Sequence, residues 1–428
     1  MIEEIYNLFE KHPKISTDTR NLEKDSIFFA LKGSSYNGNE FAKFALDNGC
    51  IAAIIDEKDK NINEKCYLVE DVLETLQEIA KIHLKKINIP VIGITGTNGK
   101  TTTKELIAAV LSKKYNINYT LGNLNNHIGV PLTILKTNKS HEIAIIEMGA
   151  NHLGEIKSLC EIANPNYGII TNIGKAHLEG FGSVEGIIKT KGELYEHIYK
   201  NDGHIFINKD NEILTTINKS KNITTYGKTQ DCDLILKNIS KELTLKFEIE
   251  QNNNIYKIET NLVGNYNVEN VMAAICIGNY FKVDINEIVL AIKNYIPTNN
   301  RSQIIKTESN TIIMDAYNAN PSSMKESLIN FNNLEIDNKV VILGDMLELG
   351  EYKNAEHENI VNQVSKMNLD KIFFVGNIFK QFKDKTKANF FENIDALNSY
   401  LKEETPIKNA NILIKGSRGI KLETIKNL

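Results

Sequence analysis

One segment combines glycines, a lysine and threonines at the spacing of a phosphate-binding loop. It reads Gly96-Thr97-Asn98-Gly99-Lys100-Thr101-Thr102 and lies between an apolar run at 89–94 and a helix-like run at 103–113. A glycine-rich turn between a strand and a helix aims successive backbone N–H groups at one point, where the helix N-terminus adds positive potential. Lys100 can then reach the β- and γ-phosphates, and the Thr101 hydroxyl can join a Mg²⁺ shell. Ile94 stands where the strict motif has its first glycine, yet the context predicts a nucleoside triphosphate site.

Two further candidates follow apolar runs that read as strands. Glu147 closes the run 143–146, and His177 lies in the loop after the run 167–171. Ligands of parallel sheets gather beyond the carboxyl ends of the strands, where a carboxylate and an imidazole could hold a metal. A strand-end glutamate is commonly a solvated rim residue, and a loop histidine commonly makes an ordinary hydrogen bond. Their joint placement around one phosphate loop favours the magnesium site.

Asparagines are concentrated in two turns. Asn123, Asn125 and Asn126 lie within 122–131, and Asn151 follows Glu147 closely. Amides in turns usually cap the local backbone. They are equally suited to a neutral, hydroxyl-rich ligand, and spacing alone leaves both interpretations open.

Composition narrows the class of protein. The chain has 428 residues, of which 42% are hydrophobic and 24% charged, with a net charge of −4, so we expect no general attraction to nucleic acid or anionic membranes. No apolar run approaches the roughly 20 residues that span a bilayer, and the acidic start Met1-Ile2-Glu3-Glu4 lacks the pattern of a signal peptide. Five scattered cysteines without metal-type spacing are typical of a reducing compartment. We expect a cytoplasmic protein without stable membrane insertion or a nucleic-acid partner.

The order of apolar runs predicts an α/β chain of three units, 1–85, 86–300 and 301–428. The first unit is small, with strands at 26–31 and 51–55 around a helix at 39–48. The second alternates strands and helices as a covered parallel sheet does, interrupted by a β-rich segment at 222–262. Its amide run 251–254 predicts a hairpin tip. The third returns to alternation as a doubly wound domain, with strands at 311–314, 340–343, 371–375 and 411–414.

Together these segments resemble the Mur ligases, the ATP-dependent amide-forming enzymes of peptidoglycan precursor synthesis. The phosphate loop resembles that of the family, including its departure from strict spacing. The other ordered matches are at 16–20, 30–33, 122–131, 147–152, 176–182, 315–321, 344–350 and 415–418. They cover nearly the whole chain and are most similar to the family member that acts last.

The resemblance implies a fold and an activity. The fold has an N-terminal domain for a UDP-linked substrate (1–85), a central P-loop ATPase-type ligase domain (86–300) and a Rossmann-like domain for the incoming dipeptide (301–428). The activity is the ATP-dependent addition of D-alanyl-D-alanine to UDP-N-acetylmuramoyl-tripeptide through an acyl phosphate. The family also implies a monomer.

Site residues carry over position by position. The resemblance implies that ATP is bound by Gly96, Thr97, Asn98, Gly99, Lys100, Thr101, Thr102, Asn267, Asn270, Arg301 and Asp315. It implies two magnesium ions held by Thr101, Glu147, His177 and Lys191, the last as a carbamate, with Lys100 completing the catalytic set. Thr17, Asp18 and Lys32 would lie along the UDP moiety, and Asn125, Asn126 and Asn151 near the muramyl-peptide. Ser417 and Arg418 would bind the carboxylate of the dipeptide.

Several points stay open at this level. Without the family, Lys191 reads as a lysine on a helix surface. Tyr266 replaces a histidine common in the family, and His127 has no assigned role. The alternatives are another ligase of this fold (an earlier Mur step, or a folylpolyglutamate or cyanophycin synthetase) and a nucleotide-gated binding module without ligase activity. The sequence leaves open whether the third residue of the tripeptide is lysine or diaminopimelate.

Overall fold

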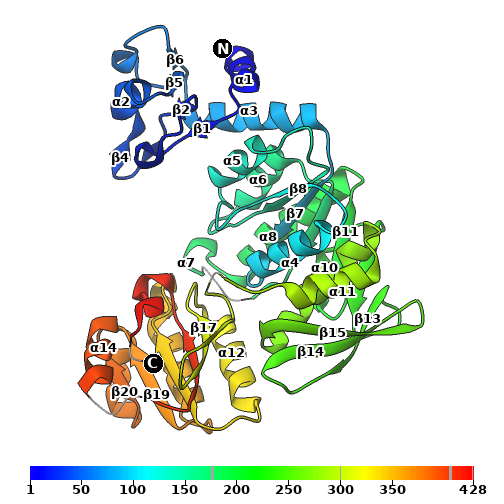
Figure 1. The fold of residues 1–428 in the computed structure, drawn as a ribbon, viewed down its shortest axis with the longest axis vertical. Helices are drawn as coiled ribbons and strands as arrows, with labels where there is room; N and C mark the ends of the chain where they lie inside the picture. The colour runs from blue at the N-terminus through cyan, green and yellow to red at the C-terminus, as the bar shows by residue number, and fades with distance from the viewer. Residues whose placement is uncertain (175–177, 299, 404–406, 427) are drawn as a thin grey trace.

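The computed structural model describes residues 1–174, 178–298, 300–403, 407–426 and 428. Three sheets with helices on their faces follow one another along the chain, and the central one lies between the other two (Figure 1). The first has four parallel strands, the second nine strands and the third six. The predicted α/β class is confirmed.

The N-terminal sheet has the order β1-β2-β5-β6, with a separate hairpin of β3 and β4. The predicted helix at 39–48 is shorter, because Gly38–Phe41 forms a 3-10 turn before α2 begins. The elements are α1 (Ile2–Lys11), β1 (Ile15–Ser16), β2 (Ile27–Phe29), β3 (Lys32–Gly33), β4 (Tyr36–Asn37), α2 (Ala42–Asp47), β5 (Ala52–Ile55) and β6 (Cys66–Leu68).

Helix α3 (Val72–Ile87) joins this sheet to the central one. Asp71 caps it by accepting a hydrogen bond from the Glu74 N–H, and Asn88 ends it in the left-handed conformation. The buried stripe of α3 belongs to one apolar cluster that contains strand residues from both sheets, such as Ile27 and Val91. The N-terminal unit therefore shares a core with the central unit (Figure 1).

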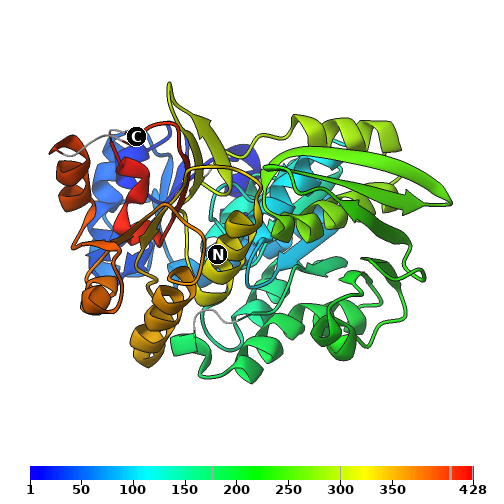
Figure 2. The same cartoon turned by 90° about the horizontal axis from the view of Figure 1, so that it is seen from below.

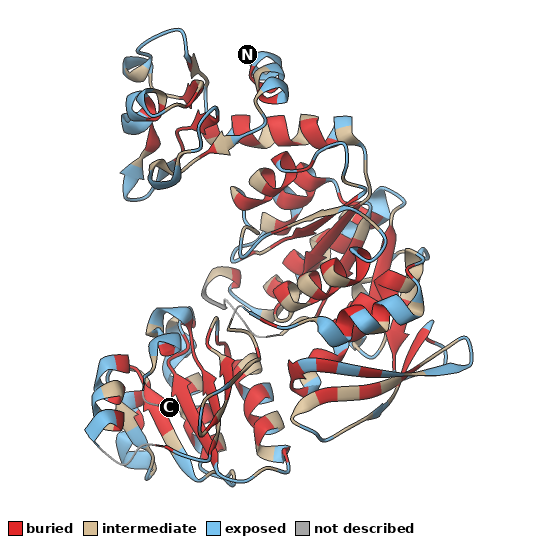
Figure 3. Ribbon diagram, in the orientation of Figure 1, coloured by how far each residue is buried: buried red, intermediate tan, exposed pale blue. Residues whose placement is uncertain are grey.

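The central sheet has the order β15-β14-β13-β12-β11-β10-β7-β9-β8. Its central strands are fully buried, as expected for a sheet covered on both faces (Figure 3). Helices α4, α10 and α11 pack in one apolar cluster, and α5, α6 and α8 in the other. The bounds are β7 (Val91–Thr95), α4 (Lys100–Leu111), β8 (Ile117–Tyr119), α5 (Gly129–Leu135), β9 (Ile143–Glu147), α6 (Glu155–Ala163), β10 (Tyr167–Ile170), α7 (Leu178–Phe181), α8 (Val184–Lys200), β11 (His204–Asn208), α9 (Glu212–Ile217), α10 (Val268–Tyr280) and α11 (Ile285–Asn294).

The β-rich segment extends this same sheet. It comprises β12 (Ile223–Gly227), β13 (Leu234–Ile239), β14 (Thr244–Gln251) and β15 (Asn254–Val263). The last two pairings are antiparallel. Asn252 and Asn253 both have positive φ, at 50° and 64°, which suits the two-residue hairpin turn predicted there.

The C-terminal sheet has the order β16-β17-β21-β18-β19-β20, and only β16 is antiparallel to its neighbour. Seen from below, the end of this domain (orange to red) and the β-rich strands of the central sheet (green) lie on opposite sides of the molecule (Figure 2). Edge strands β16 and β20 were not predicted. The elements are β16 (Gln303–Lys306), β17 (Thr311–Asp315), α12 (Pro321–Asn333), β18 (Lys339–Gly344), α13 (Lys353–Val364), β19 (Lys371–Val375), β20 (Asn389–Phe391), α14 (Ile394–Glu403) and β21 (Asn411–Lys415). Within the described ranges, no helix combines the length and apolar character needed to cross a bilayer.

Candidate nucleotide and substrate site

The phosphate loop connects β7 to α4 at the middle of the central sheet. Helix α4 begins at Lys100, three residues before the predicted run, so the loop N–H groups and the helix N-terminus meet at one place. The neighbouring strand end fixes the loop: the Asn98 N–H donates to Asn172 Oδ1 at 2.9 Å, and Thr171 Oγ1 donates to the Asn98 carbonyl at 2.6 Å. These two hydrogen bonds tie the loop to the end of the neighbouring strand β10.

Both loop glycines are required by their surroundings. A Cβ on Gly96 would lie 2.0 Å from Thr171 Oγ1, and a Cβ on Gly99 would lie 2.3 Å from Asn270 Oδ1. Gly99 also has a φ of 78°, a conformation that favours glycine. The glycines therefore allow the close contacts that fix the loop.

Lys100 lies over the loop that it would use to bind phosphate. Its ammonium donates to the carbonyls of Gly96 and Thr97, at 2.7 and 3.1 Å. Burial lowers the pKa of Lys100 to about 8, with Glu147 opposing and Arg301 adding to the shift. The position of Lys100 between loop carbonyls and the cavity suits a residue that turns toward phosphate oxygens.

Glu147 ends β9 beside the loop and is only 1% exposed. Its Oε1 accepts hydrogen bonds from Thr101 Oγ1 at 3.2 Å and from Asn125 Nδ2 at 2.8 Å. Its Oε2 is buried and accepts no hydrogen bond from a described residue. A buried carboxylate oxygen with unused lone pairs beside a threonine hydroxyl is a donor set that suits a hard cation.

Lys104 is a functional candidate that sequence reasoning missed. Its side chain is fully buried, and its ammonium lies 3.5 Å from Glu147 Oε2 and 3.1 Å from Glu105 Oε1. It also donates to the Gly122 carbonyl, at the start of the first asparagine turn. Lys104 therefore joins α4, the strand-end carboxylate and this turn. The sequence signal that could have identified Lys104 is its position one helical turn after Lys100.

We expect Lys104→Met to destabilise the fold by about 3 kcal/mol, because it leaves a buried carboxylate without its counter-charge. Denaturant unfolding measures this. Lys113→Met is a matched control, since Lys113 lies beyond the end of the same helix in a partly exposed pair with Glu287 and should cost less than about 1 kcal/mol. Equal effects of the two substitutions would contradict the bridging role of Lys104.

The predicted residues from three parts of the chain line one cavity of about 600 Å³. Its lining comes from the phosphate loop, both asparagine turns, the start of α10 and a set of C-terminal residues around Arg301, Asp315 and Lys415, which we call the C-terminal wall. The predicted residues in its lining are Thr97, Asn98, Gly99, Lys100, Thr101, Thr102, Asn125, Asn126, Glu147, Asn151, Asn267, Asn270, Arg301 and Asp315. The cavity also contains His127, to which no role was assigned.

The C-terminal wall carries opposite charges at neighbouring strand ends. Asp315 and Lys415 end the adjacent parallel strands β17 and β21 and form an ion pair. The guanidinium of Arg301 stacks over the ring of Tyr317, with its Cζ 3.9 Å from the ring centroid. Its Nε is buried without a hydrogen-bond partner among the described residues. This donor remains available to a ligand in the cavity.

Asn267 and Asn270, which the family resemblance predicts to bind ATP, form a hydrogen-bonded chain. Asn267 Nδ2 donates to the Val263 carbonyl, Asn270 Nδ2 donates to Asn267 Oδ1, and Asn270 Oδ1 accepts from Thr103 Oγ1. They tie the start of α10 to α4. Tyr266, which replaces the common histidine, has its hydroxyl 2.9 Å from Ser302 Oγ and so links the central unit to the segment that enters the C-terminal sheet.

The interpretation of Lys191 as a lysine on a helix surface is wrong. The residue lies in α8 and is only 2% exposed, with its ammonium 5.5 Å from the centroid of the Phe181 ring. Burial and the charge of Lys100 hold the pKa of Lys191 well below its usual value. The side chain therefore faces the protein interior, and Lys191 is not among the residues that line the cavity. His177, the other predicted residue here, lies outside the described residues.

Three predicted N-terminal residues lie outside the cavity lining. Arg20 donates to Asp18 and lowers the pKa of its carboxyl to about 2. Lys32 pairs with Asp56 at 2.9 Å and Glu57 at 3.0 Å. The structure does not bring these residues, or Thr17, to the phosphate loop, and their contact with a UDP moiety stays a prediction.

Ser417 and Arg418, the two residues predicted to bind the dipeptide, lie in different surroundings. The hydroxyl of Ser417 is buried and accepts a hydrogen bond from the Leu347 N–H, so it holds the loop after β18. Arg418 is exposed, and its Cζ lies 5.4 Å from the ring centroid of Tyr317, which lines the cavity. Arg418 is thus better placed than Ser417 to meet a ligand.

Known proteins resemble the chain over nearly its whole length. Residues 94–278 match the Mur ligase middle domain, and residues 300–418 match the Mur ligase glutamate ligase domain. A UDP-N-acetylmuramoyl-tripeptide–D-alanyl-D-alanine ligase from Bacillus subtilis is 38% identical, over 96% of this chain and 92% of the relative. A protein of the same name from Haemophilus influenzae is 32% identical, over the same shares of the two chains.

Solved structures agree with these relatives. A crystal structure of MurF from Acinetobacter baumannii has a TM-score of 0.87 at 29% identity and covers 96% of this chain and 92% of its own. MurF ligase from Thermotoga maritima in complex with ADP has a TM-score of 0.85 at 27% identity and covers 96% of both chains. On this evidence the chain belongs to the Mur ligase family.

Proposed function

We propose that this protein joins D-alanyl-D-alanine to UDP-N-acetylmuramoyl-tripeptide at the expense of ATP. One observation carries the proposal: the phosphate loop, Glu147, both asparagine turns and the C-terminal residues Arg301 and Asp315 line a single cavity. The names of the relatives from B. subtilis and H. influenzae, which match along nearly the whole chain, support the same reaction.

The chemistry requires an activated acid, because a carboxylate does not react with an amine in water. The terminal carboxylate of the tripeptide attacks the γ-phosphorus of ATP, forming an acyl phosphate and releasing ADP. The amine of D-alanyl-D-alanine then attacks the acyl carbon, phosphate leaves, and the nitrogen loses a proton. Lys100 and the loop N–H groups stabilise the charge on the transferring phosphoryl group.

The C-terminal wall has a separate task. Acyl phosphates hydrolyse, so the reacting atoms must be protected from water. Arg301 and Asp315 line the same cavity as the phosphate loop, and we propose that they close over the nucleotide. Asn125, Asn126 and Asn151 would bind the muramyl-peptide, and Arg418 the carboxylate of the dipeptide.

The donor set around Glu147 suits magnesium. Thr101 and Glu147 would hold it, with His177 and a carbamate on Lys191 completing the site for two ions. When bound, magnesium neutralises phosphate charge during transfer. The modification would replace the positive charge of Lys191, which is only 2% exposed, with a negative charge that could help to position magnesium.

We also propose the division of labour among the three units: UDP binding by 1–85, ATP binding by 86–300 and dipeptide binding by 301–428. A cytoplasmic location is proposed because the reaction consumes ATP and all five cysteines are free thiols. We propose a monomer, which sedimentation can test.

An amine panel tests the proposed function. With ATP, magnesium and UDP-N-acetylmuramoyl-tripeptide, we expect phosphate release with D-alanyl-D-alanine and none with single amino acids. Precursors carrying lysine or diaminopimelate in the third position should be run in parallel, which identifies the tripeptide. Release with a single amino acid and a precursor shorter than the tripeptide, and none with the dipeptide, would instead indicate an earlier ligase of this fold. Phosphate release without any ligated product would indicate a nucleotide-gated binding module.

A further inference from the structure

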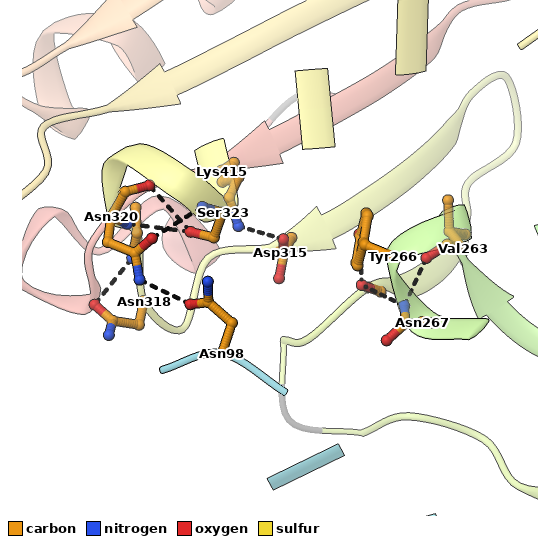
Figure 4. A network of polar contacts seen from close by, with 11 residues as sticks. Asn98, Val263, Tyr266, Asn267, Asp315, Asn318, Asn320, Ser323 and Lys415 are labelled. Carbon is orange, nitrogen blue, oxygen red and sulfur yellow. Dashed lines mark hydrogen bonds and ion pairs between the residues drawn. The ribbon is translucent and has the colours of Figure 1, made fainter. Parts of the chain in front are cut away.

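The side chain of Asn320 makes contacts in two directions at the start of α12. Its Oδ1 accepts a hydrogen bond from the Ser323 N–H at 2.9 Å, and its own N–H donates to Ser323 Oγ at 3.1 Å, which together cap the helix. Its Nδ2 donates to Asn98 Oδ1 at 2.8 Å. The first contact stays within the C-terminal domain, and the second crosses to the phosphate loop (Figure 4).

The partner of this crossing contact is fixed in place. Asn98 donates from its backbone to Asn172 Oδ1 and accepts at its carbonyl from Thr171 and Asn172. Asn320 is equally fixed, since it is 7% exposed and bound to its own helix. Because the Asn98 backbone and the Asn320 side chain are each hydrogen-bonded within their own domain, we expect the bond between them to break when the domains separate.

The segment 315–320, which ends at Asn320, also carries residues that line the cavity. Asp315 ends β17 five residues before Asn320, and Tyr317, which lies under Arg301, is between them in sequence. A second approach lies nearby, at Gly174 in the loop after β10: a Cβ on Gly174 would be 3.3 Å from Ser322 Oγ and 3.7 Å from Thr97 Cγ2. The start of α12 thus contacts the phosphate loop through Asn98 and approaches the neighbouring loop at Gly174.

We propose that Asn320 is a positioning residue that docks the C-terminal domain on the phosphate loop through Asn98. The contact holds the segment 315–320 at the cavity, so that Arg301 and Asp315 are presented to the nucleotide. This role rests on the proposed function, and it concerns the arrangement of the domains in addition to the helix cap that Asn320 also provides.

The test separates docking from capping by two substitutions. Asn320→Ser keeps a good N-cap but is too short to reach Asn98. Asn320→Asp keeps both the cap and the reach, because Asn98 can reverse its amide and donate to the new carboxylate. We expect both variants to keep the wild-type Tm. The Ser variant should raise the KM for ATP about fivefold, which corresponds to one lost hydrogen bond, and the Asp variant should stay near the wild type.

Inter-domain distance gives a readout that does not depend on turnover. Dyes on Lys200→Cys in the central unit and Lys366→Cys in the C-terminal domain, both at exposed positions, should report a longer mean distance in the Ser variant with ADP and magnesium. This result would stand even if no amine were ligated, so a failure of the proposed function is distinguishable. Wild-type distance and KM in the Ser variant would overturn the proposal. A longer inter-domain distance in both variants, together with a lower Tm, would also overturn the proposal. Asn320 would then act as a helix cap alone.

Discussion

Lys100→Ala is expected to lower turnover at least about a hundredfold, because it removes several kcal/mol of charge stabilisation from the transferring phosphoryl group. In the structure the Lys100 ammonium lies on the carbonyls of Gly96 and Thr97 at the edge of the cavity. Steady-state kinetics with all three substrates measures the loss.

The fold should survive this change, since the loop is also held by Asn172 and Thr171. Lys100→Met is the matched variant, because it keeps the length of the side chain without the charge, and it should lose as much activity as the alanine variant. Unchanged Tm with lost turnover would place the effect in catalysis. Wild-type turnover in either variant would contradict the assignment of the phosphate loop.

Lys191→Ala is expected to be nearly inactive, with partial rescue by a short-chain carboxylate such as acetate. The reason is the proposed carbamate: alanine removes the anion and leaves a space beside Phe181, which a small carboxylate can fill. Turnover measured with and without acetate checks this. In the wild type, the intact mass should show one added CO₂.

Lys191→Met separates rescue from a general salt effect. Methionine fills the space that the lysine side chain occupied, so this variant should be inactive and should not respond to acetate. A fully active alanine variant would show that no carbamate is needed. Equal stimulation of both variants by acetate would likewise count against it.

Much of the fold was readable from local pattern. The strand, glycine turn and helix around Lys100 predicted a phosphate loop, and the apolar runs predicted the strands β7, β9 and β10 closely. The edge strands β16 and β20 were not predicted, because they are short and each pairs with a neighbouring strand on one side only. The β-rich segment was found, but its continuation of the central sheet depends on non-local pairing.

Lys191 was misread despite a usable signal. Ile187, Lys191, Leu194 and Ile198 are spaced by four, three and four residues, which is the spacing of one helix face, and all four are buried. Residue type alone predicts an exposed lysine at this position. The periodicity of its neighbours was the better guide.

Other parts of the site had no local signal. Asp315 and Lys415 pair because β17 and β21 are neighbours, and one sequence does not reveal that strand order. Asn98 and Asn320 meet only because two domains dock. Such contacts depend on tertiary arrangement, and the family resemblance was the only guide to Asp315 before the structure.

The most direct measurement is the mass of the uridine nucleotide after incubation with ATP, magnesium, UDP-N-acetylmuramoyl-tripeptide and D-alanyl-D-alanine. We predict a product heavier than the tripeptide precursor by the dipeptide less one water, with one ADP formed for each product. A precursor whose mass is unchanged while all reactants are present would contradict the proposal that this chain is the ligase.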